Sequence, residues 1–255
     1  MQSIYETVIP KKIHYCWFGE NAHSQLVENC LKSWAKYMPD YEIIKWNEKN
    51  FDINICKYTR QAYESGKYAF VSDYARLSIL YNHGGIYLDC DVEILKPLDF
   101  LMMNEAFTGF ETRNLLAAWI IASKAGHSLI KEFLDYYDGR SFIKEDEKYD
   151  LTPNTNNITT ICTRYGLKSN NQLQLVRGLT VYPMTYFCPW KPNEKKHSFT
   201  ENTYTIHHFE GSWLTIEQKK MRKSPFWPVA HELGKLALKI LGSKKYMKLK
   251  ELMKI

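Results

Sequence analysis

Apolar and polar positions near the start of the chain predict two strands with a helix between them. Residues 13–18 form a short β-rich run closed by Gly19, and residues 41–46 form a second run of the same kind. Between the two runs, residues 23–36 place apolar side chains at the three- and four-residue spacing of a helix. The chain therefore begins with a β-α-β unit.

The next segment continues this alternation. A helix is predicted near residues 55–65, and a stronger helical pattern covers residues 68–82. Gly84 and Gly85 end that pattern, because glycine is common just after a helix. Residues 86–88 then form a third strand. The order β-α-β-α-α-β is typical of an α/β fold with a mostly parallel sheet flanked by helices.

The rest of the chain shows weaker patterns. Residues 107–111 and 119–123 are predicted strands, and residues 128–137 are a predicted helix. The other segments are assigned by the same criteria: a loop at 139–157, a helix at 158–165, an extended stretch at 173–183 and a charged loop at 191–200. No internal repeat or low-complexity tract is present.

Charge is unevenly distributed along the chain. Residues 219–255 hold 11 Lys or Arg and only Glu232 and Glu251, a net charge of +9, which leaves −3 for residues 1–218 of the total of +6. We therefore predict one domain at residues 1–218 with a basic C-terminal helical appendage at residues 219–255. This distribution argues against a nucleic-acid partner bound across the fold and favours an anionic surface met at one end.

The basic appendage has amphipathic character. Residues 229–241 place apolar side chains at helical spacing, and Gly242 and Ser243 then interrupt the helix. Further apolar residues alternate with five lysines up to the C-terminus. Two interpretations stay open. Residues 229–255 bind an anionic membrane surface, or the first helix packs on the domain and only the end is solvated.

Cysteine spacing and hydropathy indicate the compartment. The six cysteines show no C-x-x-C pair and no spacing typical of a zinc site, so a reduced, cytoplasmic interior is the simpler expectation. The N-terminus lacks a long apolar stretch, and the run at residues 115–122 is far shorter than the ~20 residues of a spanning helix. We expect a cytoplasmic protein without a classical signal or membrane span. The basic appendage leaves the inner face of the cell membrane open as its location.

The sharpest chemical feature is the sequence GGIYLDCDVEILKPL, in which a strand ends at Asp89 and Asp91. Residues two apart on a strand point to the same side, so both carboxylates can face one cation beyond the strand's end. Open α/β sheets bind ligands there, and a hard ion such as Mg²⁺ or Mn²⁺ can bridge a diphosphate. An isolated Asp-x-Asp is more often a solvated strand end, but the glycine pair and apolar strand before it strengthen the metal interpretation.

Three further features carry chemistry. Asp73 and Arg76 lie three residues apart on an otherwise apolar helix, where they form either a structural bridge or a clamp for a ligand. His207 and His208 stand before a glycine turn; adjacent histidines are usually surface or core residues, but an imidazole there could complete the metal site. Trp17, at the end of the first strand, is by itself more often a core residue than a platform for a cofactor.

Together these segments resemble glycosyltransferase family 32, whose members carry a sugar-binding Asp-x-Asp motif. The family includes bacterial capsular-polysaccharide transferases and yeast mannosyltransferases, and its motifs recur in the glucosylating domains of large clostridial toxins. The matching stretches are IPKKIHYCWFG, SWAKYMPDYEIIKWNEKNFD, YAFVSDYARLSILYNHGGIYLDCDVEILKPL and HHFEGSW. They cover most of residues 9–98 and one island near residue 210, and the rest of the chain matches only loosely.

This resemblance implies a GT-A fold and a specific reaction. A sugar would move from a nucleotide-sugar donor, a UDP-sugar rather than a GDP-sugar, to a glycan acceptor with retention of anomeric configuration. The implied cofactor is Mn²⁺ or Mg²⁺. The implied setting is bacterial surface polysaccharide synthesis, in which the basic appendage would bring the enzyme to a lipid-linked acceptor.

The resemblance also implies roles for individual residues. Trp17 would stack on the base of the donor, and Asp73 and Arg76 would grip hydroxyls of its sugar. Asp89 and Asp91 would bind the metal, with His208 favoured over Glu210 as the third ligand. The implied donor-binding set is Trp17, Asp73, Arg76, Tyr87, Asp89, Ser212 and Trp213. The implied catalytic set is Asp73, Arg76, Asp91 and Trp213.

The implied mechanism follows from where charge develops. The metal, Arg76 and the ring N–H of Trp213 would stabilise the leaving diphosphate. The acceptor hydroxyl would attack from the leaving-group face, and a phosphate oxygen would take its proton. Two other functions compete. A metal-dependent phosphohydrolase normally needs a base or nucleophile and more ligands than this cluster offers. The intact Asp73, Arg76, Asp89 and Asp91 argue against a catalytically silent carbohydrate-binding or scaffold protein.

Overall fold

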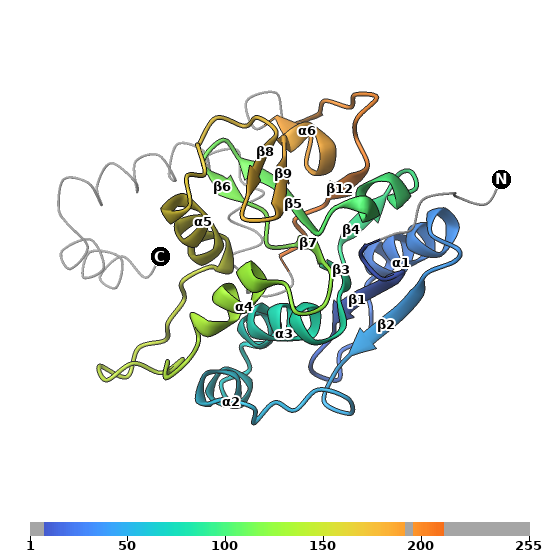
Figure 1. The fold of residues 1–255 in the computed structure, drawn as a ribbon. Coiled ribbons are helices and arrows are strands. Elements are labelled where there is room, and N and C mark those ends of the chain that lie inside the picture. Colours follow the sequence, from blue (N-terminus) through green and yellow to red (C-terminus); the bar gives the residue numbers. More distant parts are fainter. Residues whose placement is uncertain (1–7, 192–195, 212–255) are drawn as a thin grey trace. The chain divides into compact units, whose positions relative to one another are not determined.

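Strands and helices alternate through residues 8–191 and 196–211, which are the residues that this computed structural model describes (Figure 1). The strands are β1 (Lys12–Cys16), β2 (Glu42–Trp46), β3 (Gly85–Leu88), β4 (Val92–Ile94), β5 (Ala106–Thr112), β6 (Leu115–Leu116), β7 (Ile120–Ser123), β8 (Gln174–Val176), β9 (Leu179–Tyr182), β10 (Trp190–Lys191), β11 (Lys196–His197) and β12 (Thr205–His207). The helices are α1 (Gln25–Tyr37), α2 (Lys57–Glu64), α3 (Tyr68–His83), α4 (Ser128–Asp135), α5 (Asn154–Arg164) and α6 (Met184–Phe187), with a 3-10 helix at Asp99–Met103.

The central sheet has the strand order β2-β1-β3-β7-β5-β9-β8, with β6 paired to β5. β1 runs parallel to β2 and β3, and β5 runs parallel to β9, while β7 is antiparallel to both of its neighbours. Two short antiparallel pairs, β4 with β12 and β10 with β11, complete the strands. The predicted α/β class is confirmed, and the β-α-β-α-α-β beginning of the chain supplies the parallel strands β2, β1 and β3.

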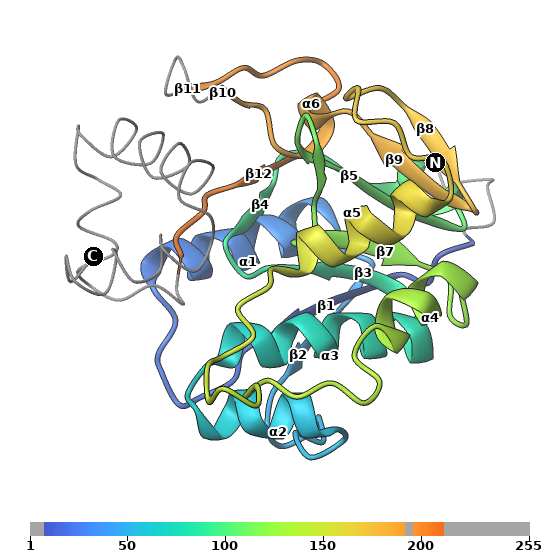
Figure 2. The same ribbon diagram turned by 90° about the vertical axis from the view of Figure 1, so that its left-hand side faces the viewer.

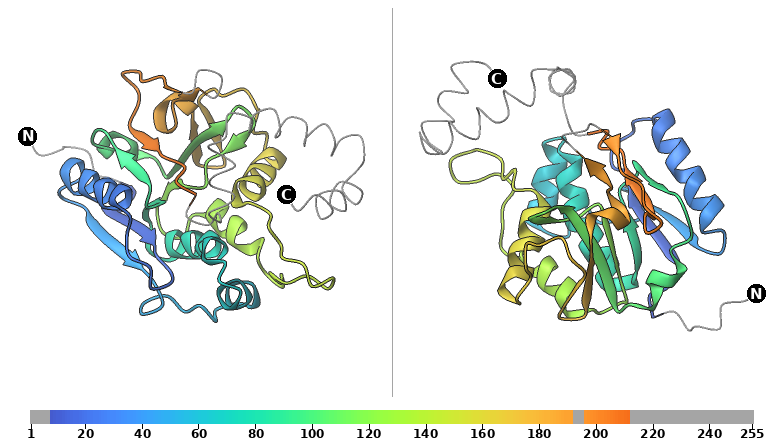
Figure 3. Two further views of the ribbon diagram at one scale, coloured as in Figure 1. Left: turned by 180° about the vertical axis from the view of Figure 1, so that it is seen from behind. Right: turned by 90° about the horizontal axis from the view of Figure 1, so that it is seen from above.

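Helices cover both faces of the sheet, and each face has its own core. One core joins α2, α3, α4 and α5 to the sheet and includes Tyr87. The other joins α1 and α6 to the sheet and includes Ile86 and Leu88. Seen from above, α1 and α3 lie on opposite sides of the strands (Figure 3). Because successive strand residues point to opposite faces, all four residues of β3 are buried, which explains its apolar sequence.

Two glycines form the turn from α3 into β3. Gly84 and Gly85 have φ values of 63° and 106°, in the left-handed region that favours glycine. A Cβ atom on Gly85 would lie 2.8 Å from Nε2 of His14 and 2.8 Å from the carbonyl oxygen of Lys12. The strand that leads to Asp89 therefore packs directly against β1 because residue 85 has no side chain.

Four segments differ from their prediction. α5 begins at Asn154 rather than at residue 158, because Pro153 suits the helix cap and the buried Asn154 and Asn157 carry no apolar signal. The predicted charged loop at residues 191–200 contains parts of the pair β10 and β11. β4 and β12 were not predicted, since strands this short show no periodicity.

The chain divides into two units, Met1–Glu210 and Gly211–Ile255. Only Gly211 of the second unit is among the described residues, so the predicted appendage at 219–255 and its amphipathic segment 229–255 lie outside them. The predicted domain boundary after residue 218 stays a prediction. Among the helices of the first unit that the structure describes, none is both long and apolar enough to cross a membrane.

Candidate metal centre and active site

A tight turn between β3 and β4 carries the two motif aspartates. Asp89 follows the last residue of β3, and its amide donates a hydrogen bond to the carbonyl oxygen of Trp119 at 2.9 Å. The amide of Val92 donates to the carbonyl oxygen of Asp89 at 3.0 Å, which closes the turn. Asp91 immediately precedes β4. The end of a buried strand and this turn therefore hold both carboxylates in place.

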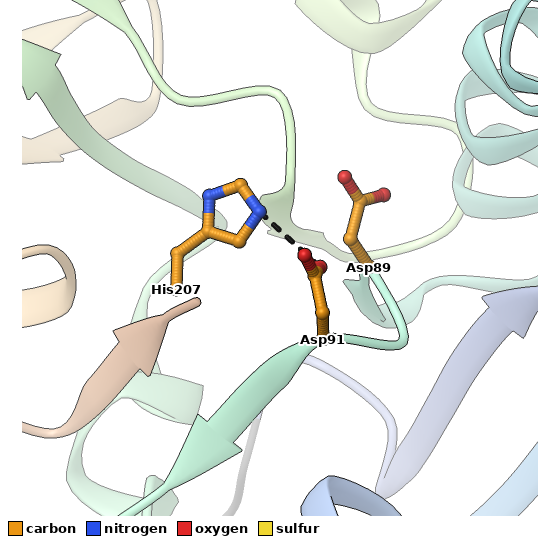
Figure 4. A group of neighbouring side chains, drawn as sticks. All are labelled: Asp89, Asp91 and His207. Atoms are coloured by element: carbon orange, nitrogen blue, oxygen red, sulfur yellow. Dashed lines mark ion pairs between the residues drawn. The ribbon is translucent and has the colours of Figure 1, made fainter. Parts of the chain in front are cut away.

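Strand β12 brings a histidine to these aspartates. It pairs antiparallel with β4, with His207 opposite Val92. Nε2 of His207 lies 3.2 Å from Oδ1 of Asp91, and the amide of Glu210 donates to Oδ2 of Asp91 at 2.8 Å. One candidate ligand atom from each of Asp89, Asp91 and His207 lies within 4.8 Å of the others (Figure 4).

This cluster fits a divalent cation by its chemistry. Two carboxylate oxygens and one imidazole nitrogen form a donor set that suits Mn²⁺ and is compatible with Mg²⁺. Burial raises the pKa of the Asp91 carboxyl, but the hydrogen bond from His207, its charge and the Glu210 amide hold that pKa below its usual value. Asp91 is therefore ionised at neutral pH, as a metal ligand must be.

The structure brings His207, rather than His208, to the aspartates. Neighbouring residues of an extended strand point to opposite sides, so the two imidazoles cannot face the same site. Nε2 of His208 lies 3.0 Å from Oε2 of Glu93 instead. Glu210 contributes to the cluster through its amide, while its carboxylate accepts a hydrogen bond from Ser24 at 3.2 Å. The preference for His208 from the sequence thus has no support in this geometry.

Arg76 connects the α3 pair with the metal cluster. Its guanidinium lies 3.0 Å from Oδ1 of Asp73 and 3.4 Å from Oδ1 of Asp89. Its N–H groups also donate to the carbonyl oxygens of Ser72 at 3.1 Å and Ala118 at 2.6 Å. Arg76 therefore bridges Asp73 and Asp89 and joins the two groups of residues that carry the sequence motifs. This position fits both a structural bridge and a clamp for a ligand.

Tyr87 belongs to the same network. Its hydroxyl lies 3.0 Å from Oδ1 of Asp89, to which it donates, and its ring lies 4.7 Å from the guanidinium carbon of Arg76. Burial raises the pKa of Asp73 to about 6, against the opposing charge of Arg76. Burial alone would lower the pKa of Arg76, but the charges of Asp89, Tyr87 and Asp73 raise it above its ordinary value. The arginine stays charged, and its charge faces two acidic side chains.

Trp17 follows β1, and its amide donates to the carbonyl oxygen of Trp46 at 2.8 Å. Its half-buried ring donates from Nε1 to the carbonyl oxygen of Asn21 at 2.8 Å, and the ring of His23 meets it edge-on at 4.4 Å. Trp17 packs with partly buried residues at the margin of one core. Both the core and the platform interpretations fit this position. Ser212 and Trp213 lie outside the described residues.

Sequence reasoning missed two side chains of this region. Trp119 is buried, and its ring lies 4.6 Å from that of His207. Burial raises the pKa of Glu111, although the charge of His207 opposes the rise. Both residues lie in or beside strands of the central sheet, where no motif distinguished them from core positions.

Comparison with known proteins agrees with the motif. The family profile described as "Glycosyltransferase sugar-binding region containing DXD motif" matches residues 24–108. An uncharacterized glycosyltransferase L373 of Acanthamoeba polyphaga mimivirus is 28% identical over 225 residues, which are 81% of this chain and 84% of that protein. Inositol phosphoceramide mannosyltransferase 3 of Schizosaccharomyces pombe is 29% identical over 48% of this chain and only 35% of its own length. The solved structure of the PaToxG glycosyltransferase aligns with 61% of this chain and 68% of its own chain, at 21% sequence identity and a TM-score of 0.46.

Proposed function

Over residues 24–108 this chain belongs to the glycosyltransferases whose sugar-binding region contains a DXD motif, and we propose that it transfers a sugar from a UDP-sugar to a glycan acceptor with retention of configuration. The reaction would depend on Mn²⁺ or Mg²⁺. The observation that supports this most strongly is the cluster of Asp89, Asp91 and His207 beside the Arg76 bridge.

The donor would lie across this cluster. Asp89, Asp91 and His207 are the residues that would hold the cation. When bound there, a divalent cation neutralises charge on the diphosphate of the donor. Arg76 is held by four oxygen atoms, so its charge needs no rearrangement to act on a neighbouring anion.

Asp73 and Trp17 would bind the two ends of the donor. The Asp73 carboxylate accepts hydrogen bonds only, which suits recognition of sugar hydroxyls. The partly exposed ring of Trp17 offers a face for the nucleobase. By the family resemblance, Ser212 and Trp213 would donate to the leaving phosphates, and His207 takes the ligand role expected for His208.

A donor screen tests this function. The purified full-length protein is incubated with a panel of UDP- and GDP-sugars and Mn²⁺, with and without methyl glycosides as acceptors, and released nucleotide is measured. We expect release from a UDP-sugar, faster with an acceptor and lost on chelation. Release that ignores every acceptor would indicate a phosphohydrolase, and no release from any donor would indicate a silent binding protein.

We propose further that residues 229–255 attach the enzyme to an anionic membrane surface, where a lipid-linked glycan of a bacterial surface polysaccharide would be its acceptor. Each lysine near an anionic leaflet contributes ~1 kcal/mol, and 229–255 contains seven of them. Truncation after Ser243 should abolish sedimentation with anionic liposomes while sparing transfer to a soluble acceptor. Full-length protein that ignores such liposomes at low salt would contradict the attachment.

A further inference from the structure

Three aromatic rings form a cluster at the surface between α6 and β12. The ring of Trp190 lies 5.1 Å from the ring of His197, and the ring of His197 stacks on that of Phe199 at 5.7 Å and 27°. Phe199 is 58% exposed, while Trp190 and His197 are half-buried. The exposed ring of Phe199 therefore stacks on a half-buried ring instead of standing alone. Trp190, His197 and Phe199 are called the aromatic cluster below.

The backbone holds the aromatic cluster in a defined arrangement. Trp190 and His197 are paired opposite each other across the antiparallel strands β10 and β11. The amide of Ser198 donates to the carbonyl oxygen of Pro189 at 2.7 Å, on the same two chain segments. Two of the three rings, Trp190 and His197, are thus presented by paired backbone, and Phe199 follows directly after the hydrogen-bonded Ser198.

The aromatic cluster is connected to the metal centre through β12. The amide of Tyr204 donates to the carbonyl oxygen of Tyr186 at 2.7 Å, and the hydroxyl of Thr205 donates to the carbonyl oxygen of Phe187 at 2.9 Å. Helix α6 therefore lies beside β12. β12 then ends at His207.

The elements that carry the aromatic cluster differ from those that carry the proposed donor residues. The proposed donor residues Trp17, Asp73 and Arg76 come from the end of β1 and from α3. In Figure 2, β4 and β12 lie between α3 and the β10–β11 hairpin. In this view the strand that begins after Asp91 and the strand that ends at His207 thus lie between α3 and the strands that carry Trp190 and His197. A transferase also needs a second substrate at that centre.

We propose that the aromatic cluster is the acceptor subsite, where a pyranose ring of the glycan acceptor stacks on the exposed aromatic face. This proposal rests on the proposed function. A pyranose ring carries C–H groups on its faces and hydroxyl groups around its edge, so it matches an aromatic face with polar groups at its rim. Ser198 and Thr200, which both carry a hydroxyl group, are the neighbours of Phe199 in the chain.

Saturation-transfer NMR of the full-length protein tests this subsite without relying on turnover. The probes are the α- and β-methyl glycosides of glucose, galactose, mannose and N-acetylglucosamine. We expect at least one glycoside to bind, and we expect Phe199→Ala to weaken that binding about tenfold, the loss of one aromatic contact. The matched control is Phe100→Ala, which removes a ring that is 67% exposed on the 3-10 helix.

Donor hydrolysis without acceptor provides the second measurement. Phe199→Ala should leave this rate and the midpoint of thermal unfolding unchanged, while it raises the KM for the acceptor glycoside about tenfold. The subsite is wrong if no glycoside binds the wild-type protein, or if Phe199→Ala and Phe100→Ala bind the glycoside equally well. Glycoside binding without any donor hydrolysis would instead contradict the proposed function and leave the aromatic cluster as a carbohydrate-binding surface.

Discussion

A buried histidine should make the stability of this protein fall between neutral and mildly acidic pH. His14 lies on β1, fully buried. The indole N–H of Trp46 donates to its Nδ1 at 3.1 Å, so its proton sits on Nε2, which donates to the carbonyl oxygen of Gly84 at 2.8 Å. Burial, with the charges of His83 and Lys12, lowers the pKa of His14 to about 4. The folded protein therefore holds this imidazole neutral.

The sign and size of the effect follow from linkage. In the unfolded chain the pKa of a histidine is about 6.5, so the unfolded state binds the extra proton first as the pH falls. The stabilisation is complete above pH 6.5 and is lost as the pH falls from 6.5 to about 4. Between pH 7.5 and pH 5.0, this one group should lower the free energy of unfolding by about 2 kcal/mol.

Urea unfolding at pH 7.5 and pH 5.0 measures this loss. Glutamine can accept from Trp46 and donate to Gly84, but it does not titrate, so His14→Gln should lose about 2 kcal/mol less than the wild-type protein between the two pH values. Replacing the exposed His83, at the end of α3, provides a second comparison: because burial is the larger cause of the lowered pKa of His14, His83→Gln should keep most of the wild-type loss. Equal losses in the wild-type protein and in His14→Gln would refute the assignment of this pH dependence to His14.

Two further predictions concern the close contact between Gly85 and β1, and the binding of the nucleotide donor by Trp17. Gly85→Ala places a Cβ atom 2.8 Å from two atoms of β1 at a φ of 106°, so it should lower the free energy of unfolding by about 2 kcal/mol or more. Gly139→Ala is the control: its φ is 70°, but nothing lies within 4 Å of the added Cβ atom, so it should lower the free energy of unfolding by about 1 kcal/mol. Similar unfolding free energies for these two variants would show that the close approach of β1 does not matter. Trp17→Ala should weaken UDP binding by about 1–3 kcal/mol in a calorimetric titration, because it removes a stacking face. A lower thermal midpoint with unchanged UDP affinity would make Trp17 a core residue instead.

The sequence predicted the strand that leads to the candidate metal centre, but not which histidine lies beside its two aspartates. The pattern from Tyr68 to Asp91 contains a long helix, a glycine turn and an apolar strand, and each of these is a local signal. The choice between His207 and His208 depends on the register of β12 against β4. That register is set by contacts between distant segments, which no local periodicity records.

Trp119 and Glu111 could not be predicted for a related reason. Trp119 sits within a run of apolar residues and looks like any other core position. It joins the site because the antiparallel strand β7 lies next to β3, so that its carbonyl oxygen meets the amide of Asp89. A strand order is a tertiary property, and the alternation of apolar residues fixes only which face of each strand is buried.

The central claim is that Asp89, Asp91 and His207 hold the catalytic cation. The two adjacent histidines provide the most direct test. Calorimetry in the presence of UDP measures the Mn²⁺ affinity of the wild-type protein, His207→Ala and His208→Ala, and Asp91→Asn serves as the reference. We expect His207→Ala and Asp91→Asn to lose Mn²⁺ affinity by about 100-fold or more, with a parallel loss of nucleotide release, while His208→Ala keeps both. Loss of Mn²⁺ affinity in His208→Ala with full retention in His207→Ala would contradict this metal centre.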